Sequence, residues 1–316
     1  KRQPGIAVID FRRPDAPHFG RVVRTLPLAA EDSPPAGQLL EAIRDVTSET
    51  AAPLHWYTAY AEATEVARSE GRMLLLYFHD PSRAECYRCF EERTLADASI
   101  ASRLQDFILA RLPVDACIRL GGEQTRLLAH RAFGEMQRQP GIAIVDYAHR
   151  DAKFHGQVVS TFPFLKGRTY SLGEMAVILD LPPGTLTQRT IIYAVRTHPE
   201  RPASASGRLD LHLVGAAENH SRHQADIQLQ GHHNWENRFH QLNSTLPSGL
   251  MASEVCAESW PGEGLLQAAI ECVRCWRLSS GHWSKVQAPQ PVYGYDMKRG
   301  GNGIWYATGI FGNFGF

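Results

Sequence analysis

Two pairs of cysteines have the C-x-x-C spacing that thiol chemistry uses. Cys86 and Cys89 follow an apolar run that predicts a buried strand, and they precede a predicted helix over residues 90–104. A thiol at the positive end of a helix loses its proton more easily, and the thiolate is the form that attacks disulfides. Cys86 and Cys89 are therefore candidates for a working dithiol pair, with structural cysteines and a metal clip as the alternatives.

The second pair lies inside a predicted helix instead of before one. Cys272 and Cys275 fall within the amphipathic stretch 264–278, next to its apolar stripe. Free cysteine is among the residue types most often buried. We expect these two, together with the isolated Cys117 and Cys256, to be buried or half-buried thiols without chemistry.

Other motifs in the sequence are weak. His220 and His223 share a predicted helix face, but no H-E-x-x-H pattern accompanies them, so a solvated or capping role is expected. The glycine-rich segment 298–303 has basic residues that could favour phosphate, yet it joins two strand-like runs and predicts a hairpin turn. The sequence contains no G-x-S-x-G, Walker or dinucleotide-binding motif.

Alternating helices and strands must position the first cysteine pair. The hydrophobic periodicity predicts helices over 57–70, 90–104 and 121–133, strands over 73–78 and 107–113, and a closing hairpin from residue 141. This order predicts an α/β sheet covered on both faces.

The closing hairpin occurs twice. Residues 2–27 realign with residues 138–163 at an offset of 136, and 14 of the 27 positions from 2 to 28 are identical. A period of that length is the size of a small domain, so the chain carries two copies of one module. A predicted helix over 38–46 follows the first copy, whose earlier part we expect to precede Lys1.

Residues 49–180 resemble a thioredoxin-like domain. The resemblance is carried by Trp56 with Tyr60-Ala61, the run 71–78, Cys86-Tyr-Arg-Cys89, Thr94 to Asp97, the run 107–112, and Gln139-Pro140-Gly141-Ile142. Residues 1–48 then match the C-terminal third of a preceding copy.

The thioredoxin-like resemblance implies a role for each residue of the pair. Cys86 would be the attacking thiolate and Cys89 the resolving thiol, with protein thiols or protein partners as substrates. Pro140 would form a cis peptide bond against the pair, and Pro4 would be its counterpart in the first copy. The sequence departs from the family in the long segment 79–85 and in having no Trp before Cys86.

Residues 183–316 resemble the bacterial form of the CAP superfamily, the cysteine-rich secretory and pathogenesis-related fold. The resemblance is carried in order by helices at 187–197 and 209–223, Gly231-His232, Glu254 to Ala257, Trp276 with Ser279-x-Gly281-His282, Tyr293-Gly-Tyr295 and Ile304 to Phe311. It implies an α-β-α sandwich.

The CAP resemblance also implies a site, because His232, Glu254 and His282 fall where that family places two histidines and an acid in one cleft. Such a set can hold a divalent metal such as zinc, relay protons, or form a structural hydrogen-bonded network. A second acid found in fuller members is Ser279 here. The tandem His232-His233 leaves open which imidazole points inward.

Composition limits the partners. Thirty-three basic and thirty-three acidic residues create no field for nucleic acid or an anionic membrane, so we expect neither. No apolar run approaches the roughly 20 residues of a membrane helix. Six cysteines are too few for a disulfide scaffold, and they leave the compartment open, whereas the CAP resemblance implies the cell envelope or secretion.

We therefore expect a thioredoxin-like α/β domain followed by a CAP-like α-β-α sandwich. The expected function is thiol–disulfide exchange at the C-x-x-C pair, as an oxidoreductase, joined to a His/Glu ligand or metal cleft. A non-catalytic binding or scaffold protein is one alternative, and a metal-dependent hydrolase centred on the CAP-like domain is another.

Overall fold

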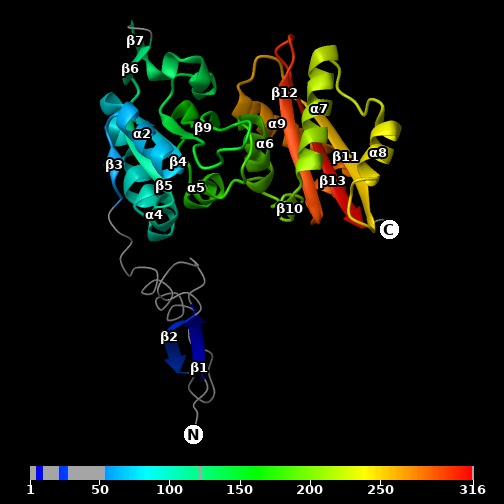
Figure 1. Cartoon of the computed structure of the whole chain (residues 1–316), viewed down its shortest axis with the longest axis horizontal. Helices are drawn as coiled ribbons and strands as arrows, with labels where there is room; N and C mark the ends of the chain where they lie inside the picture. The colour runs from blue at the N-terminus through cyan, green and yellow to red at the C-terminus, as the bar shows by residue number, and fades with distance from the viewer. Residues whose placement is uncertain (1–4, 10–20, 28–53, 121–122, 315–316) are drawn as a thin grey trace.

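A computed structural model describes residues 5–9, 21–27, 54–120 and 123–314. Beyond an N-terminal hairpin, they form two α/β units, each built on one main sheet (Figure 1). The predicted helix over 38–46 and Pro4 lie outside the described residues. Within the described part of the chain, no helix is long and apolar enough to cross a bilayer.

The first unit is built on a five-stranded sheet in the order β3-β5-β4-β8-β9. Its strands are β3 (Trp56–Tyr57), β4 (Met73–His79), β5 (Phe107–Pro113), β8 (Gly141–Val145) and β9 (Val158–Pro163). β3, β5 and β4 are parallel, β8 is antiparallel to β4, and β9 is antiparallel to β8. The predicted α/β class is confirmed, and the arrangement is consistent with a thioredoxin-like fold.

The apolar run of β4 is explained by burial on both faces of this sheet. Leu74 and Leu76 pack with residues of α2 (Tyr60–Glu70) on one face. Leu75 and Tyr77 pack with residues of α4 (Ala98–Leu104) on the other.

The predicted helix over 90–104 is two segments, and helical turns also precede it. A 3-10 turn, η1 (Pro81–Arg83), leads into α3 (Ala84–Cys89), which continues as a π-helix, η2 (Phe90–Leu95), before α4 begins. The chain breaks at Asp97 because its extended backbone and its carboxylate, which accepts the Ser99 N–H, start a new helix. The C-x-x-C pair therefore lies inside a helix, and the prediction that it precedes one is wrong.

The predicted helix over 121–133 is also wrong. Residues on either side of 121–122 form a hairpin of β6 (Cys117–Leu120) and β7 (Glu123–Arg126). Two 3-10 turns follow, η3 (Leu127–Ala129) and η4 (Arg131–Met136), which bury apolar side chains without a continuous helix. His130 separates them with an extended backbone and accepts the Ala132 N–H at Nδ1.

The two hairpins of the sequence repeat have the same strand register. β1 (Gly5–Ile9) pairs with β2 (Val22–Pro27) so that Gly5 faces Pro27, and β8 pairs with β9 so that Gly141 faces Pro163. Both pairs shift register before their last residue, after Val8 in one and after Ile144 in the other. The hairpin geometry thus follows the repeated sequence, including the bulge.

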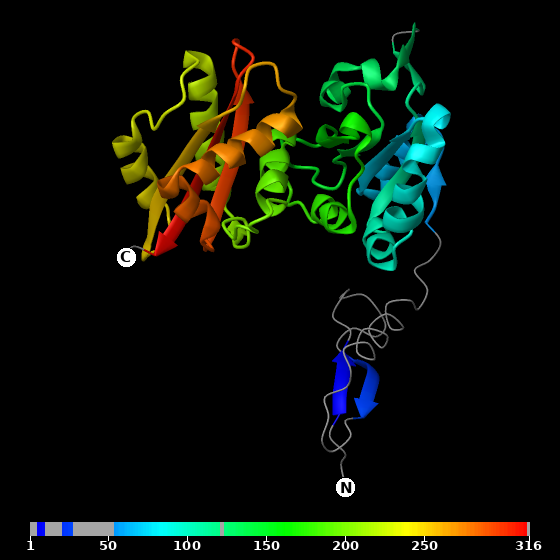
Figure 2. The ribbon, with the colours of Figure 1, turned by 180° about the vertical axis from the view of Figure 1, so that it is seen from behind.

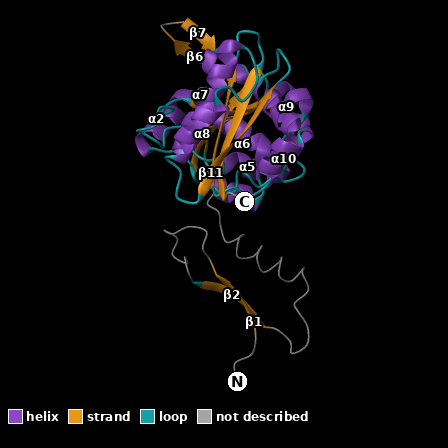
Figure 3. Cartoon of the chain, turned by 90° about the vertical axis from the view of Figure 1, so that its right-hand side faces the viewer, coloured by secondary structure: helices purple, strands orange, loops and turns teal. Residues whose placement is uncertain are grey.

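The second unit is a three-layer α-β-α arrangement, as predicted. Its sheet has the order β10-β12-β13-β11 and contains β10 (Arg208–Leu209), β11 (Leu250–Glu258), β12 (Val292–Arg299) and β13 (Trp305–Phe314). Helices α7 (Leu211–Ile227) and α8 (Trp235–Asn243) cover one face, and α6 (Leu186–Arg196), α9 (Leu265–Leu278) and α10 (Ser280–Gln287) lie on the other side (Figure 3). The glycine-rich segment is the predicted hairpin turn, between β12 and β13.

The two units pack against each other, with α5 (Leu172–Leu179) and α6 between the two sheets (Figure 2). The buried Arg189 of α6 donates from Nε to Ser160 Oγ of β9 at 2.8 Å. Glu135 of the first unit accepts the N–H of Leu265, the first residue of α9, at 2.7 Å. Apolar residues of both units belong to one buried cluster.

Candidate functional site

The candidate site is centred on Glu254 of β11. Alternate residues of this strand face opposite helical layers, and Ala252 packs with α7 and α8 residues whereas Val255 packs with the α9 layer. Glu254 shares the face of Ala252, and its side chain is only 1% exposed. Arg238 of α8 binds both carboxylate oxygens, with Nη2 2.8 Å from Oε1 and Nη1 in contact with Oε2.

Glu254 is ionised in this environment. Burial opposes the charged form, but the hydrogen bonds from Arg238 and His232 outweigh it and lower the pKa of Glu254 to about 2. A carboxylate fixed by a two-pronged guanidinium contact is both charged and immobile.

His232 is the inward member of the tandem pair. Its Nδ1–H donates to Glu254 Oε1 at 2.9 Å, since an ionised carboxylate can only accept. The neighbouring His233 turns away and donates from Nε2 to the Leu229 carbonyl at 3.1 Å. Asn234, in the left-handed region at φ 52°, ends this turn before α8 begins. The His232 side chain is 41% exposed, so the site opens to solvent on its Nε2 side.

His282 completes the predicted set from the other helical layer. Ser279 caps α10 by accepting the His282 N–H, so the position of the missing second acid serves as a helix cap. The Nε2 atoms of His282 and His232 are 3.2 Å apart. Burial and the neighbouring His232 lower the pKa of His282, which favours the neutral imidazole.

The structure thus brings the three predicted residues together, but as a chain of contacts and not around one point. Glu254 touches Nδ1 of His232, and His282 touches Nε2 on the opposite side of the same ring. The two Nε2 atoms share one hydrogen bond, in which one ring donates and the other accepts. Glu254 is therefore an orienting carboxylate for His232 and not a third ligand beside the two histidines.

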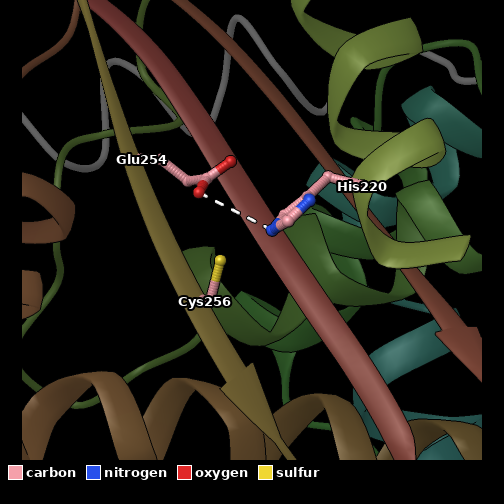
Figure 4. A group of neighbouring side chains, drawn as sticks. All are labelled: His220, Glu254 and Cys256. Atoms are coloured by element: carbon pink, nitrogen blue, oxygen red, sulfur yellow. Dashed lines mark ion pairs between the residues drawn. The ribbon is translucent and has the colours of Figure 1, made fainter. Parts of the chain in front are cut away.

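Two further side chains of the site were missed from the sequence. His220 of α7 and Cys256 of β11 lie with Glu254 so that one ligand atom of each is within 4.8 Å of the others (Figure 4). His220 is buried, and the expected solvated or capping role is wrong. The sequence did contain a sign of this burial. His220 follows Leu213 and Ala217 at helical spacing, on the buried stripe of α7.

His220 and Cys256 are neutral and already engaged. Burial lowers the pKa of His220, whose Nε2 donates to the Gly231 carbonyl at 2.9 Å and lies 3.7 Å from Glu254 Oε1. Burial, then the charge of Glu254, raise the pKa of the Cys256 thiol. The Cys256 sulfur is 3.7 Å from His232 Nδ1. The guanidinium of Arg238 on the same carboxylate disfavours a second positive charge among these buried atoms.

The exposed His232 and the half-buried His282 fit a cation better. Two nitrogens bound to tetrahedral zinc at about 2.0–2.1 Å are about 3.3 Å apart. The observed separation of the His232 and His282 Nε2 atoms is 3.2 Å. In metal sites, a ligating histidine commonly donates its other ring N–H to a carboxylate, as His232 does to Glu254. The donor set and its spacing therefore suit zinc or a similar divalent ion.

The C-x-x-C pair lies in the first unit, on another part of the fold. Cys86 and Cys89 are the third and last residues of α3, and both are exposed free thiols. Pro140 is buried before β8, and its carbonyl accepts the Phe164 N–H at 2.7 Å. The described residues contain no cis peptide bond. The prediction of a cis bond at Pro140 is therefore wrong. The turn before it is made by Gln137 and Arg138, both at positive φ.

The expected burial is confirmed for three of the other four cysteines. Cys256 and Cys272 are buried and Cys275 is half-buried, as expected, and all are free thiols. Cys117 is exposed, which contradicts the expectation, because it lies on the β6–β7 hairpin and not in a core-packed element.

Comparison with known proteins adds little to this geometry. No family model matches the chain, and no curated protein does. Among solved structures, a thioredoxin from Thermus thermophilus aligns with 29% of this chain at 26% identity and a TM-score of 0.21. The alignment covers 65% of that thioredoxin, less than two thirds of its length.

Proposed function

We propose that the second unit binds a divalent cation of the zinc type through Nε2 of His232 and Nε2 of His282. The observation that carries the proposal is the 3.2 Å separation of these two nitrogens at a solvent-open surface. The resemblance of residues 183–316 to the CAP superfamily and the α-β-α layering support it.

Glu254 and Arg238 would prepare this site without touching the ion. The ionised Glu254 holds the Nδ1–H tautomer of His232, which leaves the Nε2 lone pair for the metal. Arg238 fixes the carboxylate and balances its charge. A metal-bound His282 would carry its proton on Nδ1. Protonation of the ligand nitrogens competes with the metal, so binding should weaken as the pH falls.

With two protein ligands, a bound zinc ion would keep open positions for water or an added ligand and would act there as a Lewis acid. The residues of the chain supply binding and orientation. The proposed function is therefore metal-dependent binding of a small exogenous ligand at the His232–His282 surface.

Zinc titration by isothermal calorimetry tests the proposal. We expect one zinc ion per chain, loss of binding in His232→Ala and His282→Ala, and a 10- to 100-fold weaker Kd in Glu254→Gln. His212→Ala, which changes an exposed histidine of α7, is the matched control and should bind as the parent protein does. Equal zinc binding by the parent protein and both alanine variants would refute the site.

Thiol–disulfide exchange is the second candidate, and one observation favours it. Cys86 and Cys89 are both exposed and lie one helical turn apart on α3. In this role the Cys86 thiolate would attack a partner disulfide, and Cys89 would displace the partner thiol to leave a Cys86–Cys89 disulfide.

The thiol role is tested by turnover with a disulfide substrate and a dithiol reductant. Cys86→Ser should abolish turnover, whereas Cys117→Ser, which removes another exposed thiol, should not change it. Equal rates in both variants would reject exchange at this pair and favour a non-catalytic binding role for the first unit.

A further inference from the structure

Two adjoining cavities lie where the two units meet. One has a volume of about 310 Å³ and the other of about 590 Å³. Glu174 of α5 and the run Thr197 to Pro199 after α6 line both. The first unit supplies one wall, and α6, α9 and the loop after α6 supply the rest, so both cavities depend on the packing of the two units. Small-molecule sites are most frequent at such junctions and begin at about 300 Å³.

The smaller cavity has a mainly apolar lining, which the Arg168–Glu174 ion pair, His198 and Gln267 also join. The rings of Tyr170 and Tyr193 form one side, with centroids 6.3 Å apart, and Leu266, Ile270 and Val273 of α9 form another. The Tyr170 hydroxyl donates to the Pro163 carbonyl at 3.1 Å. The Thr197 hydroxyl donates to the Tyr193 carbonyl at 2.8 Å. These hydroxyl groups are satisfied by the backbone, so the cavity favours a ligand part without polar atoms.

The larger cavity carries uncompensated positive charge. Arg196 bonds only to neutral acceptors, with its guanidinium 3.1 Å from the carbonyls of both Asp180 and Ala205. Arg201 is exposed and forms no ion pair within the described structure. Glu174 is the one carboxylate among the described residues lining either cavity, and Arg168 neutralises it at 2.9 Å. Three arginines against one glutamate leave a surplus of two positive charges.

His198 supplies a neutral donor at the boundary between the cavities. Its Nδ1 accepts the Glu200 N–H at 3.2 Å, which places the imidazole proton on Nε2. Its ring packs on Trp283 with the centroids 4.8 Å apart. An anion at this boundary would meet one N–H donor and two unneutralised guanidinium groups.

We infer that the junction binds a small amphiphilic monocarboxylate, with its apolar tail between Tyr170, Tyr193 and α9 and its carboxylate at Arg196 and Arg201. The smaller cavity would suit the apolar tail, and the positively charged larger cavity beside it would suit the carboxylate. A ligand in this position would touch both units and would favour their packed arrangement.

Calorimetric titration with dodecanoate below its micelle threshold tests the inference, and dodecanol is the uncharged comparison. We expect one dodecanoate per chain and at least tenfold weaker binding of dodecanol, because a charged hydrogen bond contributes about 1.5–3 kcal/mol. Equal affinity for the two, or no binding of dodecanoate, would overturn the inference.

Two variants on α9 locate the tail. Ile270 lines the apolar cavity and is 53% exposed, so Ile270→Glu should fold normally and bind dodecanoate at least tenfold more weakly. Leu278 is 71% exposed on the same helix and lines neither cavity, so Leu278→Glu should bind like the parent protein. Equal affinity in both variants would contradict the assigned position.

Arg201 locates the carboxylate. Arg201→Ala should weaken dodecanoate about tenfold without changing dodecanol, and Arg201→Lys should restore part of the affinity. An unchanged affinity in Arg201→Ala would contradict the assigned head-group position. Zinc binding at His232 and His282 should be the same in all these variants, so the two proposals fail or succeed separately.

Discussion

Nε2 of His232 and Nε2 of His282 lie 3.2 Å apart, although 50 residues separate them in the chain. His232 precedes α8 in one helical layer, and His282 belongs to α10 in the other. The two layers meet at β11, which is an edge strand of the sheet and carries Glu254. The site therefore forms only when both layers are packed on this strand.

Glu254→Gln should destabilise the protein by about 3 kcal/mol, because it leaves the partly buried guanidinium of Arg238 without its counter-charge. Urea unfolding followed by circular dichroism measures this. The control is Glu271→Gln, which breaks a pair with the half-exposed Arg274 and should cost far less, because solvent screens that pair. A similar loss of unfolding free energy in the two variants would show that the Glu254–Arg238 pair stabilises the protein no more than an exposed pair does.

Acid should destabilise the metal-free protein through Glu254. Its pKa falls from 4.5 to about 2 on folding, so its stabilising contribution is complete above about 4.5 and is lost as the pH falls towards 2. A shift of that size corresponds to about 3 kcal/mol. The urea midpoint measured from pH 6 to pH 2 with a chelator present should therefore fall more steeply in the parent protein than in Glu254→Gln. Parallel curves would contradict the lowered pKa.

Gly294→Ala should disturb the helix that carries His220. A methyl group at Gly294 of β12 would lie 2.3 Å from the backbone of Leu213 in α7, so the helix has to move. We expect a loss of about 1–3 kcal/mol in thermal or urea unfolding. Gly215→Ala, at an α7 position with open space, is the control and should stabilise by about 0.5–1 kcal/mol. Stabilisation by both changes would contradict the close approach.

Much of the fold could be predicted because its strands have distinctive patterns. The prediction of a covered α/β sheet followed from the alternating order of helices and strands, and the buried run at β4 agrees with it. The predicted helix over 121–133 was wrong, and its apolar residues Leu127, Leu128 and Phe133 would not have shared one helical face. Tertiary packing decides their structure, since short 3-10 turns bury the same three side chains.

The site could be predicted only in outline. The resemblance placed His232, Glu254 and His282 together. It did not show that they form a chain of contacts, in which His232 lies between Glu254 and His282. Arg238 was not predicted, because an arginine on the amphipathic α8 looks like a solvated residue until the helix is packed on β11. Which of His232 and His233 points inward depends on the backbone turn at Asn234, and no side-chain pattern encodes that turn.

Thiol labelling should separate five of the six cysteines into two groups, with the half-buried Cys275 between them. Cys86, Cys89 and Cys117 are exposed and should react with a thiol reagent in the native protein. Cys256 and Cys272 are buried, and burial raises the pKa of both thiols, so they should react only after unfolding. Mass spectrometry of peptides after timed alkylation measures each site. Rapid native labelling of Cys256 would contradict the closed packing around Glu254.

Anomalous diffraction at the zinc absorption edge, from crystals grown with stoichiometric zinc, tests the central claim most directly. The account predicts one peak about 2.0–2.1 Å from Nε2 of both His232 and His282, with Glu254 still bound to Nδ1 of His232 and to Arg238. A zinc ion bound instead by Glu254, His220 and Cys256, or no peak near either histidine, would contradict it.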